Sequence, residues 1–283
     1  MDRFSAKNVN ALLRKNGVRA SKSMGQNFLI DDSVTVKIVE MADFTGADSV
    51  LEVGAGLGIL TLALSNTVKH VTAVELDKRL LPALRELFSG ISNVDIVQGD
   101  ILKLDIGKLV EDTMPGGSRH VCANLPYNIT TPALTLFIDS GLFQTITVMM
   151  QREVAQRICA KPGSPEYGAF TVYANYHTVP EILFTVPPEC FIPRPGVYSA
   201  VVKMKKHDGR ILGTEEEAMF FRAVRAAFSQ RRKTLVNALY AVFGNKFSKE
   251  ELAKMAIECG FDERVRGEML SIEQFAALSK MLM

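Results

Sequence analysis

The sequence predicts an α/β fold: a parallel sheet that ends in an antiparallel hairpin, followed by a small all-helical domain. Three observations lead to this prediction. Apolar, strand-like runs alternate with helix-like runs from residue 48 onward, which is typical of a parallel sheet covered on both faces. The last two strand-like runs follow each other without a helix between them. Beyond residue 206 only helical spacing of apolar residues remains.

The strands and helices of the sheet domain come in a regular order. The strand DSVLEVG leads through glycines into the helix LGILTLALSN, and the strand HVTAVEL leads into the helix DKRLLPALRELFSG. NVDIVQGD and RHVCANLP are the next strands, TPALTLFIDSG is a helix closed by Gly141, and TITVMMQ is the fifth strand. A helix, YGAFTVYANYH, precedes the final strands EILFTVP and VYSAVVKMK, which flank the loop PECFIPRPG.

The C-terminal part contains four helix-length segments. They are EEEAMFFRAVRAAF, RKTLVNALYAVF, SKEELAKMAIECG and SIEQFAALSKML. The polar, glycine-containing stretch KKHDGR separates them from the sheet, and 283 residues are enough for two hydrophobic cores. We therefore expect two domains, residues 1–206 and residues 207–283.

The composition excludes several classes of protein. No charge-free apolar run reaches 18 residues, and the N-terminus lacks the apolar core of a signal peptide, so we expect a soluble, cytoplasmic protein. The cysteines stand singly, without a CxxC pair, which argues against a disulfide framework and a zinc site. The histidines form no ligand-spaced cluster either, so we expect no metal.

Two stretches are basic although the net charge is only +2. Residues 1–30 hold six Lys/Arg against one acid, and residues 222–239 hold five and no acid. The five are Arg222, Arg225, Arg231, Arg232 and Lys233. Local basic stretches in a near-neutral protein predict contact with a polyanion, and the alternative is two solvated helix faces.

Three consecutive strand ends carry groups suited to a nucleoside ligand. LEVGAGLG places Gly54 and Gly56 after the first strand, where a missing Cβ lets backbone approach a ligand. Glu75 ends the second strand, where a carboxylate can bind ribose hydroxyls, and Asp100 ends the third. A tight turn and helix N-caps are the alternatives. The combination resembles the S-adenosylmethionine site on the Rossmann-like sheet of class I methyltransferases.

The fourth strand ends in Asn124-Leu125-Pro126-Tyr127, which resembles the (Asn/Asp)-Pro-Pro-(Tyr/Phe) motif of enzymes that methylate exocyclic amino groups. Adenine N6 is a poor nucleophile because its lone pair is delocalised into the ring. Acceptors at the Asn124 side chain and the Leu125 carbonyl can stabilise the charge that develops on transfer. Pro126 stiffens the turn, and Tyr127 offers a face for stacking.

Phe191 is a further candidate in the loop CFIPRPGVYSAV. An aromatic residue on a loop stiffened by Pro193 and Pro195 could sandwich a flipped base against Tyr127. A core residue anchored under a proline loop is an equally good explanation.

Seven motifs in order resemble the small-subunit ribosomal RNA adenine N6,N6-dimethyltransferases: SMGQNFLID, LEVGAGLGILT, VTAVELD, GDIL, NLPYNI, FIPRPGVYSAV and AAFSQRRKTLVNAL. The resemblance implies dimethylation of two adjacent adenosines near the 3′ end of small-subunit rRNA, in an immature 30S-type particle, by a monomer. The cofactor-binding residues it implies are Gln26, Asn27, Leu29, Gly54, Gly56, Glu75, Leu76, Asp100, Ile101 and Asn124. The departures, Ala55 and Gly58 in the glycine loop and Arg194 between the prolines, are small.

Three other functions remain open at this point. A large-subunit rRNA adenine methyltransferase of the macrolide-resistance type shares the sheet motifs, although the helical tail favours the small-subunit enzyme. A non-catalytic assembly or transcription factor would be expected to have degenerate glycines or a broken NLPY, and both are intact. A DNA adenine methyltransferase would need an extra domain for reading duplex sequence.

Overall fold

The computed structural model describes residues 4–18, 25–209 and 212–283, and the chain forms two compact units. The first unit contains residues 1–155 and 181–206, and the second contains residues 156–180 and 207–283. Residues 156–180 were expected in the first domain. In the structure they pack with the C-terminal helices, for example through the Tyr167 hydroxyl, which donates to the Leu270 carbonyl at 2.9 Å.

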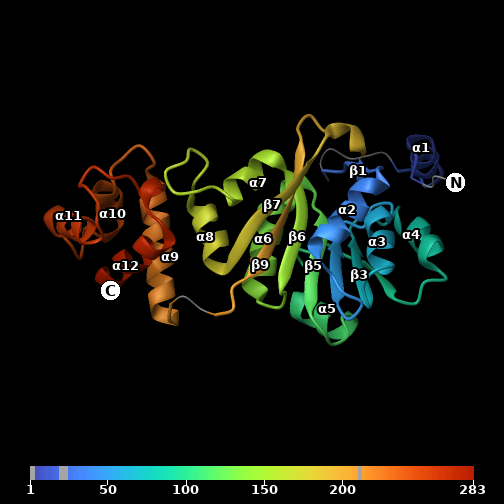
Figure 1. Cartoon of the computed structure of the whole chain (residues 1–283), viewed down its shortest axis with the longest axis horizontal. Coiled ribbons are helices and arrows are strands. Elements are labelled where there is room, and N and C mark those ends of the chain that lie inside the picture. The colour runs from blue at the N-terminus through green and yellow to red at the C-terminus, as the bar shows by residue number, and fades with distance from the viewer. Residues whose placement is uncertain (1–3, 19–24, 210–211) are drawn as a thin grey trace. The chain divides into compact units, whose positions relative to one another are not determined.

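A seven-stranded sheet has the strand order β4-β3-β2-β5-β6-β9-β7 (Figure 1). The strands are β2 (Ser49–Val53), β3 (His70–Glu75), β4 (Val94–Gln98), β5 (Arg119–Asn124), β6 (Thr145–Gln151), β7 (Thr178–Val186) and β9 (Ser199–Lys206). The strands from β2 to β6 pair in parallel, and β9 runs antiparallel to β6 and lies between β6 and β7. The predicted mixed sheet is therefore confirmed. Its central strands β2, β3 and β5 are almost fully buried, as a sheet covered on both faces requires.

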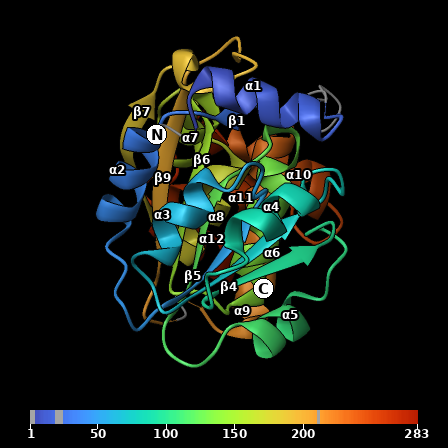
Figure 2. The same cartoon turned by 90° about the vertical axis from the view of Figure 1, so that its right-hand side faces the viewer.

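The first unit has helices before the sheet and, along the chain, between its consecutive parallel strands. The helices are α1 (Ala6–Lys15), α2 (Asp32–Ala42), α3 (Ile59–Ser65), α4 (Leu81–Phe88), α5 (Ile106–Thr113), α6 (Thr130–Ser140) and α7 (Arg152–Ile158), the last of which continues into the second unit. Those from α3 to α6 connect the parallel strands. The expected helices α3, α4 and α6 are confirmed, and Gly141 closes α6 in a left-handed conformation. Figures 1 and 2 show α1 at one end of the strands and α5 at the opposite end.

A second, two-stranded sheet was not expected from the sequence. β1 (Phe28–Leu29) pairs antiparallel with β8 (Phe191–Ile192), next to the short 3₁₀ helix Pro188–Cys190. The pairing continues in a hydrogen bond from the Ile30 N–H to the Cys190 carbonyl at 2.9 Å. It joins the N-terminal GQNFL segment to the FIPRP loop, two motifs that lie far apart in the sequence.

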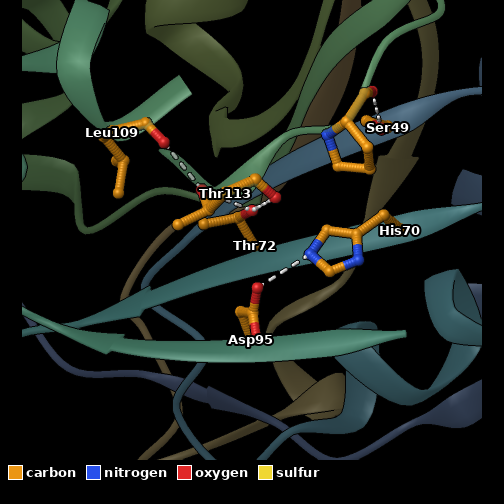
Figure 3. Close-up of polar contacts among 7 residues, drawn as sticks. Ser49, His70, Thr72, Asp95, Leu109 and Thr113 are labelled. Atoms are coloured by element: carbon orange, nitrogen blue, oxygen red, sulfur yellow. Dashed lines mark hydrogen bonds and ion pairs between the residues drawn. The ribbon is translucent and has the colours of Figure 1, made fainter. Parts of the chain in front are cut away.

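At the α5 end, side-chain hydrogen bonds fasten the connection from α5 to β5 onto the strands (Figure 3). The Thr72 hydroxyl contacts Thr113 Oγ1 at 3.0 Å, and Thr113 Oγ1 donates to the Leu109 carbonyl at 2.7 Å. The Ser49 hydroxyl donates to the Pro115 carbonyl at 3.0 Å. This end of the sheet is therefore closed by structural contacts, whereas the glycine motif lies at the other end.

The second unit is helical apart from its loops and its share of β7. Its helices are α8 (Ala169–His177), α9 (Thr214–Ser229), α10 (Leu235–Phe243), α11 (Lys249–Glu258) and α12 (Ile272–Met281). All four expected C-terminal helices are confirmed, with one correction. The segment Arg232–Lys233 belongs to a turn, because Thr234 caps α10 by accepting the N–H of Asn237.

Among the described residues, no helix combines the length and apolar character that crossing a membrane requires. Of the N-terminal basic cluster, Lys7, Arg14 and Lys15 are exposed on α1. Arg3, Arg19 and Lys22 lie outside the described residues.

Candidate active site

A cavity of about 280 Å³ opens at the carboxyl ends of β2, β3, β4 and β5, which place their terminal side chains around it. The predicted residues that line it are Gln26, Asn27, Leu29, Gly54, Gly56, Glu75, Leu76, Asp100, Ile101, Asn124, Leu125, Pro126 and Tyr127. This convergence is the one expected from the sequence, because parallel strands present their carboxyl ends at one edge of the sheet. The role of each residue stays a prediction.

The glycine turn takes a conformation that few other residues adopt. Gly54, Gly56 and Gly58 have φ angles of +77°, +57° and +83°. A Cβ on Gly58 would lie 2.8 Å from a methyl carbon of Leu87, so this glycine serves the packing of α4. Gly54 and Gly56 line the cavity, which leaves them as the positions where backbone can approach a ligand.

Glu75 is held rigidly at the end of β3. Its Oε2 accepts the Gly56 N–H at 2.8 Å, and its Oε1 accepts the Asp77 N–H at 2.7 Å. The side chain is only 5% exposed, and burial raises its pKa. Each carboxylate oxygen has a further lone pair, so the group can still accept from a ligand in the cavity.

Asp100 follows β4 in a turn. Its Oδ1 accepts the Leu102 N–H at 3.1 Å, and its Oδ2 lies 3.6 Å from the Lys103 ammonium. Asp100 thus caps a turn, and the alternative of a helix N-cap does not describe it, because no helix begins at residue 101. The contact occupies only part of the carboxylate, and the residue lines the cavity beside Ile101.

Glu52, a third carboxyl group on the cavity beside Glu75 and Asp100, was not predicted from the sequence. It lies in the middle of the apolar strand β2, is 1% exposed, and its Oε2 has no partner among the described residues. Burial raises its pKa to about 8, and the nearby Glu75 contributes in the same direction. Glu52 is therefore protonated in the folded protein at neutral pH.

This protonation predicts a pH dependence of stability that Glu52→Gln removes. The raised pKa, about 8 against 4.5 in the unfolded chain, means that the folded state holds a proton the unfolded state has released. The Glu52 contribution is therefore fully present below pH 4.5 and is lost as the pH rises toward 8. From pH 6 to pH 8 we expect the free energy of unfolding of the wild-type protein to fall by about 2 kcal/mol more than that of Glu52→Gln. Urea unfolding at the two pH values measures the difference. Equal losses in the two proteins would contradict a protonated Glu52.

The NLPY turn projects from the end of β5. The Leu125 N–H donates to the Met149 carbonyl of β6 at 3.1 Å, which fixes the direction in which the turn leaves the sheet. Asn124 Nδ2 lies 3.5 Å from the Asn27 carbonyl, an orientation that leaves Oδ1 as an acceptor. The Tyr127 hydroxyl bonds to Ser199 Oγ at 2.8 Å, and burial raises its pKa. The Tyr127 ring is thus held in one position with its hydroxyl uncharged, and it lines one side of the cavity.

The N-terminal segment forms one wall of the cavity. Gln26 Nε2 donates to Asp77 Oδ2 at 3.1 Å. Arg79 holds Asp77 with two hydrogen bonds, at 2.9 and 2.7 Å, which lower the pKa of Asp77 to about 2. Phe28 packs against Gly56, where an added Cβ would lie 3.4 Å from its ring. The predicted covering segment therefore contacts the glycine turn directly.

Phe191 does not line the cavity. Its side chain is 2% exposed and belongs to the hydrophobic core of the first unit, because pairing with Leu29 turns it inward. This burial matches the alternative of a core residue anchored under the proline loop. Base stacking by Phe191 remains a prediction, and it would require the ring to leave this packing.

The predicted RNA-binding residues differ in their surroundings within the second unit. Arg222 stacks over the Phe243 ring with its guanidinium carbon 4.7 Å from the centroid. Arg231 donates to the carbonyls of Pro165 and Tyr167 at 3.0 and 2.8 Å. Arg225, Arg232 and Lys233 are also exposed. Arg231 therefore has a structural role whether or not it also meets RNA.

No group of three or more His, Cys, Asp or Glu side chains within residues 4–18, 25–209 and 212–283 could hold a metal ion. The acids on the cavity, Glu52, Glu75 and Asp100, are instead tied to backbone N–H groups or buried in the protonated form.

Comparison with known proteins agrees with this geometry. Residues 17–283 match the family model described as ribosomal RNA adenine dimethylase. The chain is 41% identical over its full length to the Ribosomal RNA small subunit methyltransferase A of Clostridioides difficile, covering 98% of that protein. It is 43% identical to the protein of the same name from Caldanaerobacter subterraneus, over 94% of this chain and 98% of the other.

Two solved structures share the fold across most of the chain. A dimethyladenosine transferase from Plasmodium falciparum superposes with a TM-score of 0.74 at 25% identity, covering 89% of this chain and 95% of the other. The 23S rRNA methyltransferase ErmE superposes with a TM-score of 0.72 at 24% identity, covering 90% of this chain and 99% of the other. The class I methyltransferase fold expected from the strand-end motifs is confirmed.

Proposed function

Because the chain belongs to the ribosomal RNA adenine dimethylase family, we propose that it transfers methyl groups from S-adenosylmethionine to N6 of adenosines in small-subunit rRNA. One observation carries the proposal. The glycine turn, Glu75, Asp100 and the NLPY turn all line a single cavity, so a nucleoside site and an amino-group acceptor site are continuous.

The residues on the cavity fit S-adenosylmethionine. Gly54 and Gly56 leave the backbone open, and Glu75 has acceptor capacity suited to two ribose hydroxyls. Asp100, which lines the same cavity, is assigned to the adenine amino group, and Gln26, Asn27 and Leu29, which also line it, are assigned to covering the cofactor. When bound, the cofactor supplies a methyl group that is carried on a sulfonium. After the transfer, the rest of the cofactor is a neutral thioether, which makes it a good leaving group.

The protein's part in the transfer is positioning and charge stabilisation. Asn124 Oδ1 and the Leu125 carbonyl would accept the two N6–H bonds, which favours a pyramidal nitrogen with an available lone pair. Pro126, with φ of −54°, holds this turn, and Tyr127 gives the adenine a face on which to stack. The positive charge that develops on N6 then meets acceptors already in place, and no strong base is required.

The finer proposal is dimethylation of two adjacent adenosines near the 3′ end of the rRNA, by a monomer acting on an immature 30S-type particle. A ribosomal substrate would place this activity in the cytoplasm. Within the second unit, Arg222, Arg225, Arg231, Arg232 and Lys233 are proposed to contact the RNA. The main candidates for RNA contact are the exposed side chains of Arg225, Arg232 and Lys233. Arg231 is a weaker candidate because it already bonds to the carbonyls of Pro165 and Tyr167.

Purified protein, labelled cofactor and small ribosomal subunits lacking the modification provide the test. We expect label in the small-subunit rRNA, at two neighbouring adenosines mapped by primer extension. Large subunits serve as the parallel substrate, because modification of their rRNA instead would overturn the assignment in favour of the macrolide-resistance type of enzyme.

Glu75 is expected to contribute to cofactor affinity. Glu75→Ala removes an acceptor for ribose hydroxyls and should weaken binding by about 1.5–3 kcal/mol, the range for hydrogen bonds to charged groups. Calorimetric titration with S-adenosylhomocysteine measures the change. Glu86→Ala is the control, because the Glu86 carboxylate is exposed on α4 and lies 3.7 Å from the equally exposed Lys15 ammonium. Unchanged affinity in Glu75→Ala would remove Glu75 from the ribose site.

A further inference from the structure

An exposed arginine–tyrosine pair, whose tyrosine is next in sequence to Ser199, the residue that holds the Tyr127 hydroxyl, is not used by the proposed chemistry. The Arg152 guanidinium carbon is 5.0 Å from the centre of the Tyr198 ring. The backbones are joined as well, because the Arg152 N–H donates to the Tyr198 carbonyl at 2.9 Å. Tyr198 is nevertheless 45% exposed, although a tyrosine ring is a large apolar surface to leave in water.

The sheet register places this pair beside the target site. Ser199 is opposite Gln151 in the β6–β9 ladder, so Arg152 and Tyr198 lie just past its end. Ser199, the residue after Tyr198, holds the Tyr127 hydroxyl at 2.8 Å. In the parallel ladder between β5 and β6, Met149 of β6 is opposite Asn124. The pair therefore lies roughly one residue, about 3.3 Å along the strand, from the serine that fixes the Tyr127 ring.

We propose that Arg152 and Tyr198 form a platform that binds the nucleotide next to the adenosine being methylated. The exposed ring offers a stacking face that every base can use. The guanidinium beside it offers a planar cation for that nucleotide's phosphate. This inference rests on the proposed rRNA substrate and extends it from the reacting adenosine to its neighbour.

Charge favours RNA as the occupant of the platform. Arg194, in the same loop as Tyr198, adds a second exposed guanidinium, paired loosely with Glu189 at 3.6 Å with both side chains largely in water. Such an exposed ion pair contributes little and is readily exchanged for a phosphate. An exposed aromatic ring beside a cation suits a single-stranded polyanion that carries flat bases.

The first test compares Tyr198→Ala with Tyr198→Phe. The probes are unmodified small subunits, for KM, and a labelled single-stranded RNA oligonucleotide with two adjacent adenosines, for Kd. We expect Tyr198→Ala to raise both values by about fivefold or more, the lower end of base–aromatic stacking, and Tyr198→Phe to restore them because the ring remains. S-Adenosylhomocysteine affinity, measured by calorimetry, reports an intact fold.

The second test uses salt. Arg152→Gln should lower the slope of log Kd against log salt for the oligonucleotide by about 0.7, the value for one phosphate contact on a single strand. Lys37→Gln is the matched control, since Lys37 forms another cation–π pair of this unit, 4.4 Å from the Phe184 ring. Its slope should equal that of wild type.

The outcomes separate this proposal from the proposed function. Wild-type protein that transfers no methyl group to either subunit contradicts the function itself. An active enzyme whose Tyr198→Ala variant binds both probes normally overturns the platform alone. The platform is also overturned if Tyr198→Ala raises the KM for subunits but leaves the Kd for the oligonucleotide unchanged. That result would show that this surface contacts a ribosomal protein instead of RNA.

Discussion

Replacing Phe191 with alanine is expected to lower the free energy of unfolding by about 3–5 kcal/mol, the usual cost of removing a fully buried phenylalanine. The ring is 2% exposed and packs in the core of the first unit. Its backbone pairs with Leu29, so loosening it also frees the segment that carries Gln26 and Asn27. Cofactor affinity should therefore fall together with stability. Urea unfolding and calorimetry measure the two effects.

Phe191→Leu separates packing from stacking. Leucine fills much of the same volume, so the free energy of unfolding of this variant should fall by less than about 1.5 kcal/mol. Its cofactor affinity should stay the same. It has no aromatic face, however. If its affinity for RNA falls while its stability holds, the predicted stacking role of Phe191 gains support. If Phe191→Ala is as stable as wild type, the core assignment is wrong.

The sequence predicted those parts of the fold in which local pattern and final environment agree. Strands such as His70–Glu75 are rich in β-branched residues and are buried along almost their whole length, so their pattern identifies them as strands. Helix α2 was missed because its sequence, DSVTVKIVEMA, is rich in β-branched residues that favour strands. Its start is nevertheless encoded locally, since Asp31 accepts the Ser33 N–H at 3.0 Å.

Features that depend on distant residues could not be predicted in the same way. The pairing of Phe28–Leu29 with Phe191–Ile192 joins two dipeptides too short to give a strand pattern, and it decides that Phe191 faces the core. Glu52 looks like an interruption in an apolar strand, and only the fold shows that it reaches the cavity beside Glu75. The strand-end residues were predictable because topology alone brings them together.

The second large effect is expected in the rate of methyl transfer. Asn124→Ala should slow a single turnover by roughly 10²–10³, about 2.7–4 kcal/mol, the cost of losing one preorganised polar partner of a developing charge. The side chain is only partly buried, and its amide nitrogen makes one long contact, 3.5 Å from the Asn27 carbonyl. Its removal should therefore leave folding and S-adenosylhomocysteine binding nearly unchanged.

The measurement uses enzyme in excess over unmodified small subunits, with saturating labelled cofactor, so that product release does not limit the rate. Asn66→Ala, which removes an exposed amide at the end of α3, controls for the substitution itself. Asn124→Asp tests the chemical reason, because it keeps an acceptor oxygen at the same place and should retain more activity than alanine. If Asn124→Ala folds, binds cofactor and transfers methyl groups at the normal rate, the acceptor at the end of β5 does not act on N6. The NLPY turn would then shape the cavity without taking part in the transfer.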